Sequence, residues 1–311
     1  MTGPATTPTV AVLLSTFNGE AYLQAQLDSL AAQEGVQVEL FVRDDGSSDA
    51  TLDILARHAK TWPRLAAPDT GAGLGPAKSF LRLLSTAPDG FGYYAFCDQD
   101  DVWLPDKLAR ATEALVHASE SGPGLYCSRV MCVDRELCAM GLSQVNPDSR
   151  FEHLLFENIA FGNTVVMNAD ARALILGSPL QAGMIMHDWW CALVVSAFGT
   201  VIHDDAARIL YRQHGGNAIG ASSLRIGEIG RHLLKLFRNP RSFYPIHDQA
   251  EALLRLFGDR LAPERRALVE ALVTSRHSLS ARLRYAATGP MIRNRPIDAI
   301  AGRVLVAAGL Y

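Results

Sequence analysis

The chain has 311 residues, of which 49% are apolar and 20% charged, and its formal net charge at pH 7 is −3. This is the composition of a globular protein, which argues against disorder, and no apolar run approaches the length that crosses a membrane. The charge is uneven, because 15 basic and 7 acidic residues lie from Arg225 onward, against 14 and 25 before it. The basic end carries no nucleic-acid-binding motif, so we expect no nucleic acid as a partner.

The cysteines and the first ten residues indicate in which cellular compartment the protein is located. The five cysteines are odd in number and form no Cys-x-x-Cys pair, which argues against a zinc site or a disulfide framework and favours reduced thiols. The first ten residues contain no basic stretch followed by an apolar one, so no signal peptide is expected. The sequence therefore predicts a cytoplasmic protein.

Short apolar runs rich in β-branched residues alternate with amphipathic stretches of helical period in the first part of the chain. We expect strands at residues 9–14, 38–42, 65–67 and 93–96, and helices at 20–32, 49–59, 77–84 and 105–119. This alternation indicates βαβ units, in which ligands bind beyond the C-terminal ends of the strands.

The pattern changes after residue 121. Strands are expected at 125–133, 164–167, 200–203 and 208–211, with a helix at 188–198. From about residue 222 the chain is almost wholly helical, with helices expected at 226–237, 248–257, 263–276, 279–286 and 297–308.

Three aspartates crowd the end of the expected strand at 93–96, within the stretch FCDQDDVW. Like charges repel one another strongly near a core, so a cation is expected beside Asp98, Asp100 and Asp101. Carboxylate oxygens suit Mg²⁺ or Mn²⁺, which would also neutralise a bound phosphate. The alternative is a solvated loop in which Asp101 only caps the following helix.

A second acidic pair, Asp44 and Asp45, follows the expected strand at 38–42 and precedes Gly46, which suits a tight turn. Their carboxylates can accept hydrogen bonds from a base edge or from sugar hydroxyls. A capped turn alone explains the glycine but does not need two consecutive aspartates, one of which Arg43 could pair. Both acidic clusters fall at strand ends, so we expect them to share one site.

Three stretches together resemble the successive signatures of family 2 glycosyltransferases, namely VLLSTFNG at 12–19, RDDGSSD at 43–49 and DQDDVW at 98–103. Two more, GLGPAKSF at 73–80 and YRQHGGN at 211–217, resemble bacterial rhamnosyltransferases of that family. The resemblance covers roughly residues 9–220. It implies the GT-A fold, a Rossmann-like α/β fold with a mixed sheet flanked by helices. We expect a catalytic domain at 1–221 and a basic helical region at 222–311.

The resemblance also implies a donor site for a nucleotide sugar. Thr16 and Asn18 would line the nucleotide pocket, and Asp44 or Asp45 would hold the base or ribose. Asp98 would bind the sugar or ribose. Lys78 and Arg212 are expected to contact phosphate. Lys78, in the first turn of its helix, could equally be solvated. The expected donor-binding side chains are Thr16, Asn18, Asp44, Asp45, Lys78, Asp98, Gln99 and Arg212.

Asp98 and Asp100 match the two ends of the DxD motif of the family, so Asp100 would bind the metal. This chain adds Asp101, and the two neighbours are interchangeable candidates. His214 follows in a Gly-rich stretch and would complete the shell of Mn²⁺ or Mg²⁺, with a solvated imidazole as the alternative. A rival cluster at 203–205, His-Asp-Asp, is explained equally well by an acidic turn.

An inverting transfer needs a carboxylate that takes the proton of the acceptor hydroxyl. The resemblance places this base at the start of a helix, where the matching stretch is HDWW at 187–190, so Asp188 is the candidate. His187 stands where an acidic residue is commoner. Trp189 and Trp190 are expected to form an apolar platform at the acceptor, and Asn163 to touch it. The alternative is that Asp188 is a helix cap and both tryptophans belong to the core.

We therefore expect an inverting, metal-dependent glycosyltransferase, and dTDP-L-rhamnose is the favoured donor on the resemblance alone. The expected acceptor is a glycan or polyprenyl-linked glycan of a cell-surface polysaccharide. The rival function is a haloacid-dehalogenase-type Mg²⁺ phosphatase, with Asp98 as nucleophile and Asp100 as general acid. That alternative leaves Asp44 and Asp45 without a role.

The basic amphipathic stretch at 226–237 is compatible with two arrangements. It would lie peripherally on the inner face of the cell membrane, or it would pack on the catalytic domain. The helical region could equally form a homodimer.

Overall fold

The computed structural model describes residues 7–62, 64–66, 68–120, 122–145, 148–177, 184, 186–214 and 246–311. The chain divides by its internal contacts into two compact units. The first comprises Met1–Val145, Ala160–Gly177 and Gly199–Ala221. The second comprises Asn146–Ile159, Ser178–Phe198 and Ser222–Tyr311. The second unit therefore includes two segments that lie before the helical region expected at 222–311.

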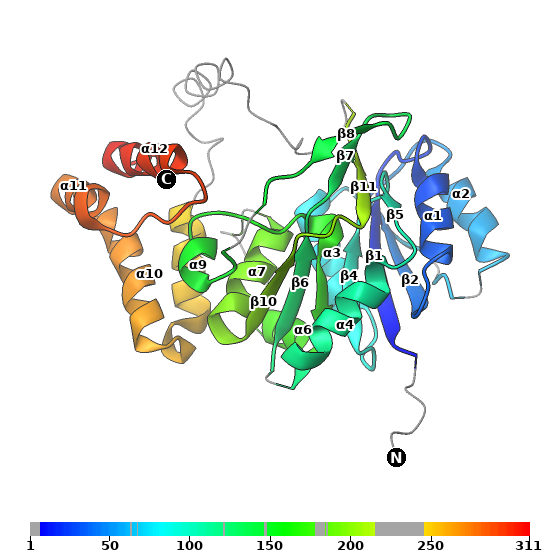
Figure 1. Ribbon diagram of the computed structural model, residues 1–311, viewed down its shortest axis with the longest axis horizontal. Coiled ribbons are helices and arrows are strands. Elements are labelled where there is room, and N and C mark those ends of the chain that lie inside the picture. The colour runs from blue at the N-terminus through cyan, green and yellow to red at the C-terminus, as the bar shows by residue number, and fades with distance from the viewer. Residues whose placement is uncertain are drawn as a thin grey trace. The chain divides into compact units, whose positions relative to one another are not determined.

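The first unit is built on a seven-stranded sheet (Figure 1). β1 pairs in parallel with both β2 and β4, as βαβ connections require. β9 runs antiparallel between β4 and β6, which makes the sheet mixed, as the resemblance implies. In spatial order the strands are β10 (Thr200–Asp204), β6 (Gly124–Ser128), β9 (Val166–Asn168), β4 (Tyr93–Cys97), β1 (Thr9–Thr16), β2 (Gln37–Asp44) and β3 (Asp69–Thr70).

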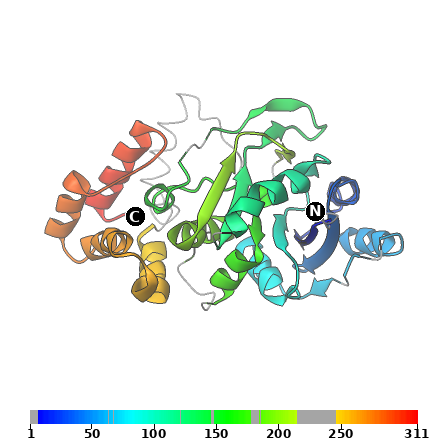
Figure 2. The ribbon, with the colours of Figure 1, turned by 60° about the horizontal axis from the view of Figure 1, so that its bottom comes forward.

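Helices cover both faces of this sheet (Figures 1 and 2). They must do so, because every side chain of β1 from Val10 to Leu14 is fully buried. Alternate β1 residues form one cluster with leucines of α1, α2 and α4. α3 covers the opposite face, where Phe80 packs on Phe96 with ring centroids 5.4 Å apart. The bounds are α1 (Leu23–Ala31), α2 (Thr51–Ala59), α3 (Pro76–Thr86), α4 (Lys107–Ser119), α6 (Ala169–Leu176) and the 3-10 helix η1 (Gly162–Thr164).

The first unit also contains a smaller four-stranded sheet. Its strands follow the order β5 (Val102–Trp103), β11 (Ile209–Arg212), β7 (Met131–Val133) and β8 (Ala139–Leu142). The strand expected at 125–133 is therefore two strands, β6 and β7, in different sheets. The chain changes direction at Arg129 and Val130, whose backbone groups bond to Asp204 and Ser143. The strand expected at 65–67 is reduced to a single bridge between Leu40 and Leu65.

The second unit is helical, and the helices expected at 188–198, 248–257, 263–276, 279–286 and 297–308 are found within a few residues of their predicted bounds. α7 is buried along its length, with every residue but Phe198 in the interior. The helix expected at 226–237 lies outside the described residues. Among those described, no helix has both the length and the apolar character needed to cross a bilayer. The bounds are α5 (Phe151–Leu154), α7 (His187–Phe198), α9 (Ile246–Phe257), η3 (Gly258–Arg260), α10 (Pro263–Ser275), α11 (Leu279–Thr288) and α12 (Pro296–Ala308).

A buried ion pair supports α5 within the second unit. The two ring nitrogens of His153 lie 2.5 Å from the Asp148 carbonyl oxygen and 3.0 Å from Glu157 Oε2. Since both partners are acceptors, only the imidazolium can donate to both. Burial opposes this charge, but the bonds to Glu157 and to the Asp148 carbonyl outweigh it and raise the pKa of His153. Burial likewise disfavours the charged Glu157, but its bonds to His153 and to the Asn294 amide lower the pKa of that carboxyl.

Glu157→Gln is expected to lower the free energy of unfolding by about 1.5 kcal/mol near pH 5.5, and by less at pH 8.5. A raised histidine pKa stabilises the fold below the ordinary value of 6.5 and stops doing so as the pH rises through the folded value. A lowered glutamate pKa stabilises it above the ordinary 4.5. The pair therefore contributes most between these values. Urea unfolding at both pH values measures the difference, and an equal loss at both would contradict it. Glu152→Gln, in the same helix, is the control.

Candidate active site

The ends of three parallel strands bring the two acidic clusters to one edge of the large sheet. Thr16, the last residue of β1, lies in register with Asp44, the last residue of β2. β4 ends at Cys97, which is in register with Leu14 of β1, and the DQDD stretch follows directly. The loops after these strands therefore lie next to one another, which is the placement expected from their positions in the sequence.

Asp44 is buried and holds the turn that follows β2. Its Oδ1 accepts bonds from the hydroxyls of Thr16 at 2.9 Å and Ser47 at 2.5 Å. Its Oδ2 accepts from the backbone amides of Gly46 at 3.1 Å and Ser47 at 2.8 Å. Gly46 has a φ of +94°, which favours glycine. Both oxygens of Asp44 are thus engaged by the protein itself, and Thr16 shares in that network.

Asp45 ties the end of β2 to the glycine-rich loop before α3. The Leu74 amide lies 2.9 and 2.8 Å from its two oxygens, and the Gly75 amide donates to Oδ2 at 2.7 Å. Arg43 donates to Oδ1 at 3.3 Å, as the sequence suggested for one of the two aspartates. Lys78 is exposed in the first turn of α3, directly after this loop. A ligand that bonds to Asp45 must compete with these two amides.

Gln99 and Asn18 join the three loops to each other. The Gln99 side-chain amide accepts from the Phe17 N–H and donates to the Phe17 carbonyl, both at 2.9 Å. Asn18, at a φ of +47°, accepts a bond from the Ser48 amide at 2.9 Å. Gly19 allows the close approach, because a Cβ there would lie 2.2 Å from Gln99 Oε1. Both predicted nucleotide-binding side chains therefore also shape the loops.

Asp100 faces His214 across a hydrogen bond of 2.8 Å between Oδ2 and Nε2, and both side chains are largely buried. Tyr22, from the loop before α1, lies beneath this pair. Its ring centroid is 4.9 Å from that of His214 and 4.6 Å from the Arg212 guanidinium carbon. The predicted pairing of a DxD aspartate with the late histidine is thus formed. The sequence reasoning missed Tyr22, whose helical spacing indicated only a core residue.

Asp101 lies in the interior. Its two oxygens accept bonds from the Asn163 side-chain amide and, at 3.1 Å, from the Arg212 backbone amide. Burial, followed by the neighbouring Asp100 charge, raises the pKa of Asp101 to about 8. The Arg212 guanidinium bonds to the carbonyls of Asp100, at 2.9 Å, and of Arg135. Asp101, Arg212 and Asn163, which were expected at the metal, the phosphate and the acceptor, are thus bonded to one another and to the backbone of Asp100 and Arg135.

The donor set at Asp100 fits a divalent ion. Two ligands of one octahedral ion at about 2.1 Å stand about 3 Å apart, and the 2.8 Å between Oδ2 and Nε2 is close to that separation. A carboxylate with an imidazole suits Mn²⁺. Asp98 lies half-buried directly after β4, two residues away.

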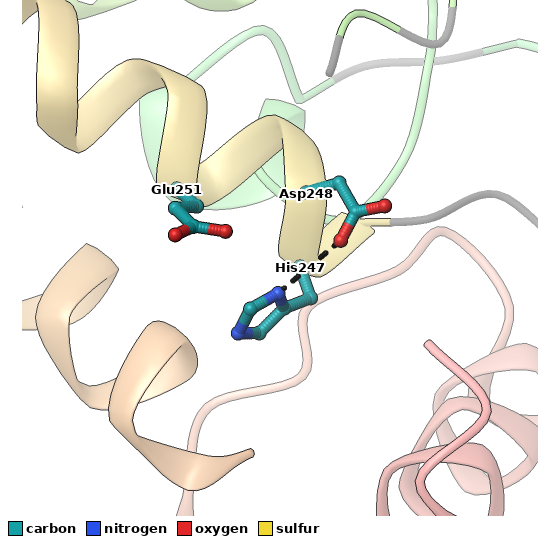
Figure 3. A group of neighbouring side chains, drawn as sticks. All are labelled: His247, Asp248 and Glu251. Carbon is teal, nitrogen blue, oxygen red and sulfur yellow. Dashed lines mark hydrogen bonds and ion pairs between the residues drawn. The ribbon is translucent and has the colours of Figure 1, made fainter. Parts of the chain in front are cut away.

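Within the parts of the chain that the structure describes, one group of three acidic or imidazole side chains brings its ligand atoms within 4.8 Å of one another. It consists of His247, Asp248 and Glu251 on α9 (Figure 3). Arg276 already donates to Asp248 at 2.9 Å and lies 3.1 Å from His247 Nδ1. Because the Arg276 guanidinium already occupies Asp248 and lies against His247, this group is a poor cation site. In the rival cluster at 203–205, Asp204 is bonded to Arg110 and Tyr126.

Asp188 belongs to the second unit, in the first turn of α7. It is 2% exposed, and its Oδ1 accepts a bond from the Trp189 amide at 2.7 Å. Trp189 donates from its ring to the Leu154 carbonyl at 2.6 Å, and Trp190 packs on Phe257 with centroids 6.4 Å apart. Both tryptophans are 1% exposed, so they lie in the core of the unit and not on an acceptor platform. Burial lowers the pKa of His187 to about 3, which keeps its imidazole neutral.

Lys107, at the start of α4, is a buried cation that the sequence reasoning missed. Its Nζ lies 3.4 Å from the centroid of the Trp103 ring and has no hydrogen-bond partner among the residues described. Burial lowers the pKa of Lys107 to about 7, although the neighbouring Cys97 acts the other way. A lysine in the first turn of a helix gives no signal in the sequence that it is buried.

Lys107 is expected to make a contribution to the free energy of unfolding that rises with pH between 7 and 9. There the unfolded lysine, with its ordinary pKa of 10.5, still binds a proton that the folded one has lost. The contribution is at most about 1.4 kcal/mol per pH unit. Lys107→Met should remove it, so the free energies of unfolding of the two proteins should diverge with pH. Lys60→Met, at an exposed position, is the control, and parallel curves for wild type and Lys107→Met would contradict the prediction.

Comparison with known proteins agrees with this geometry. Residues 11–139 match the model of the family described as Glycosyl transferase family 2. The chain is 27% identical over 218 residues to the dTDP-rhamnosyl transferase RfbG of Shigella flexneri, which covers 67% of this chain and 74% of that protein. The family match stands against the phosphatase alternative.

Two solved structures resemble the fold. TarS 1–349 of S. aureus, in complex with UDP-GlcNAc, has a TM-score of 0.57 at 18% identity, covering 96% of this chain and 81% of the 1–349 chain. The mannosyltransferase PcManGT of Pyrobaculum calidifontis, in complex with GDP-Man and Mn²⁺, has a TM-score of 0.51 at 19% identity, covering 99% and 82%. At these identities the likeness concerns the fold alone. The matches identify residues 11–139 as a family 2 glycosyltransferase domain on the GT-A fold, and 218 residues of the chain resemble a bacterial dTDP-rhamnosyl transferase.

Proposed function

We propose that the protein transfers L-rhamnose from dTDP-L-rhamnose to a glycan acceptor, with inversion, in the synthesis of a cell-surface polysaccharide. The observation that carries the proposal is the Asp100–His214 pair at the strand ends of a family 2 glycosyltransferase domain. The likeness to RfbG, a dTDP-rhamnosyl transferase, supports the donor. The acceptor in this proposal is a glycan, either free or linked to a polyprenyl lipid. With a polyprenyl-linked acceptor, the enzyme would work in the cytoplasm at the inner face of the membrane.

Asp100 and His214 would hold Mn²⁺ or Mg²⁺, with Asp98 on the ribose or sugar. The ion supplies positive charge next to the diphosphate, which favours its departure without a general acid. PcManGT was solved with Mn²⁺, which is in keeping with this choice. We favour Asp100 over Asp101 as ligand, because both oxygens of Asp101 are bonded inside the protein.

The nucleotide would bind over the loops that Thr16, Asn18, Asp44 and Gln99 hold in place. Asp45 is the side chain that we assign to the base or ribose, in exchange for its bonds to the glycine-rich loop. The exposed Lys78 would reach a phosphate after that exchange. The roles of Thr16, Asn18, Asp44 and Gln99 are then to position these loops.

Asp188 is the base in this proposal. A carboxylate within hydrogen-bond reach of the acceptor hydroxyl takes its proton as the oxygen attacks the anomeric carbon. Asp188 is buried together with Trp189 and Trp190 in the first turn of α7. Asn163, Trp189 and Trp190 are not assigned to the acceptor, because Asn163 bonds to Asp101, Trp189 bonds to the Leu154 carbonyl and Trp190 packs on Phe257.

Thermal-shift titration with dTDP, UDP and GDP, each with and without Mn²⁺, tests the donor. A ligand that binds the folded state raises the melting temperature by mass action. We expect a shift with dTDP that needs Mn²⁺ and is lost in Asp100→Ala and His214→Ala. A larger shift with UDP or GDP would overturn the rhamnose donor and leave the family assignment standing. A shift with dTDP that does not depend on Mn²⁺ would contradict the proposed metal dependence of donor binding.

A further inference from the structure

Tyr22, the residue directly before α1, contacts the histidine of the proposed metal site through its ring. The ring centroids of Tyr22 and His214 are 4.9 Å apart, with an angle of 34° between the ring planes. The Arg212 guanidinium carbon lies 4.6 Å from the centroid of the same tyrosine ring. Two side chains from the end of β11 and just beyond it, two residues apart, therefore contact one aromatic ring.

Tyr22 is held at its backbone and at its ring. Its amide donates to the Gly19 carbonyl at 3.1 Å. The Gly19 amide in turn donates to the Thr51 hydroxyl at 2.8 Å, which ties this turn to the start of α2. At the ring, the Arg212 guanidinium adds a cation–π contact while it is bonded to the Asp100 carbonyl at 2.9 Å. The position of the tyrosine ring is therefore fixed by the loops of the site itself.

His214 lies just beyond the backbone pairing of β11. The Gln213 amide makes a bond of 2.9 Å to the Val133 carbonyl, and His214 is the next residue. The orientation of its ring therefore depends on side-chain contacts. Two of these are the bond of 2.8 Å from Nε2 to Asp100 and the packing on Tyr22.

Metal binding affects these two contacts differently. An imidazole nitrogen that binds a metal cannot also donate a hydrogen bond, so an ion at Asp100 and His214 would replace the bond between them. The contact with Tyr22 is made by the ring and uses neither nitrogen. It can therefore keep the imidazole directed at the carboxylate while the ion is bound. Removal of a neighbour that orients a ligating histidine typically weakens metal binding by about 10- to 100-fold.

We propose that Tyr22 is a positioning residue of the metal site, and that its ring holds the His214 imidazole in the orientation that binds the ion. The inference rests on the proposed metal site at Asp100 and His214, and it adds a residue which that proposal does not contain. The tyrosine contacts with His214 and Arg212 are both made by the ring. An aromatic ring is therefore required at position 22, and the hydroxyl is not.

Binding of Mn²⁺ to the full chain in the presence of dTDP tests this role, with the electron paramagnetic resonance signal of free Mn²⁺ as the readout. Tyr22→Leu should weaken Mn²⁺ binding at least about tenfold. Tyr22→Phe keeps the ring and should bind Mn²⁺ as the wild type does. The matched control is Tyr93→Leu, because Tyr93 is a half-buried tyrosine at the start of β4, away from the strand ends of the site. This control should leave Mn²⁺ binding unchanged.

A double-mutant cycle with His214→Ala separates positioning of the imidazole from a general loss of structure. Once the imidazole is absent, Tyr22→Leu should have little further effect on Mn²⁺ binding. An equal loss with and without His214 would overturn the proposal. Full Mn²⁺ affinity in Tyr22→Leu, or the same loss in Tyr22→Phe as in Tyr22→Leu, would overturn it as well. Circular dichroism and melting temperature show that each variant is folded.

The same measurements distinguish a failure of this inference from a failure of the metal site. If the wild type binds no Mn²⁺, or if His214→Ala binds it as tightly as the wild type, the proposed metal site is wrong and the role of Tyr22 is wrong with it. If His214→Ala loses Mn²⁺ binding and Tyr22→Leu does not, the metal site stands and only the role of Tyr22 is wrong.

Discussion

Asp100→Ala is expected to lower the rate of sugar transfer about a thousandfold at saturating donor and Mn²⁺. The diphosphate that leaves carries charge that the ion at Asp100 and His214 would balance. A metal supplies several kcal/mol of such stabilisation, and about 4 kcal/mol corresponds to a factor of a thousand. The fold should not suffer, because the charge of Asp100 acts against its buried neighbour Asp101. Initial rates of nucleotide release, measured across a Mn²⁺ titration, give the effect.

The control for Asp100 is Asp53→Asn, an exposed carboxylate in the first turn of α2. It removes one negative charge from the same unit and should leave the rate and the Mn²⁺ dependence as in the wild type. His214→Ala should weaken the apparent affinity for Mn²⁺ in the same direction as Asp100→Ala. Activity of Asp100→Ala within about tenfold of wild type would remove Asp100 from the metal site.

Asp188→Asn is expected to lower the rate of transfer by about a thousandfold while nucleotide binding stays unchanged. The asparagine keeps an oxygen that can accept the bond from the Trp189 amide, so the start of α7 is preserved. What it loses is the ability to take a proton from the acceptor. Single-turnover rates with donor and acceptor, alongside nucleotide thermal shifts, separate these two functions.

Asp188→Ser provides the second half of that experiment. A serine hydroxyl can still accept the bond from the Trp189 amide but cannot act as the base, so this variant should keep the melting temperature and lose transfer as asparagine does. A rate near that of the wild type for Asp188→Asn would show that Asp188 only supports the first turn of α7. A loss of transfer that follows the melting temperature through both variants would lead to the same conclusion.

The strand and helix order of the first unit could be predicted from the sequence because each element has its own period. The failures have local causes. β5 has two residues, and every residue of β8 is exposed, so neither produces an apolar alternation. β6 and β7 read as one strand, since the change of direction at Arg129 depends on a bond to Asp204, far along the chain.

The candidate site was predicted by residue type better than by role. Asp100 and His214 do lie together. Asp44, Asp45 and Asp101 were read as ligand contacts, but all three are buried and bonded to groups of the protein. The partners of Asp45 lie about thirty residues away, and Arg212 is brought to Asp101 by a strand of the second sheet. Sequence shows where carboxylates are, but it does not show which of them the fold already uses.

The joined loops at the strand ends restrict how this binding edge can change. Gln99 bonds to the backbone of Phe17, and Asn18 bonds to the backbone of Ser48. These bonds form only if each of the three loops keeps its present length. An insertion or deletion in one loop would break backbone contacts in another. A change in loop length is therefore a poor way to change the donor specificity of this site. Donor specificity would change more readily through replacement of side chains on loops of unchanged length.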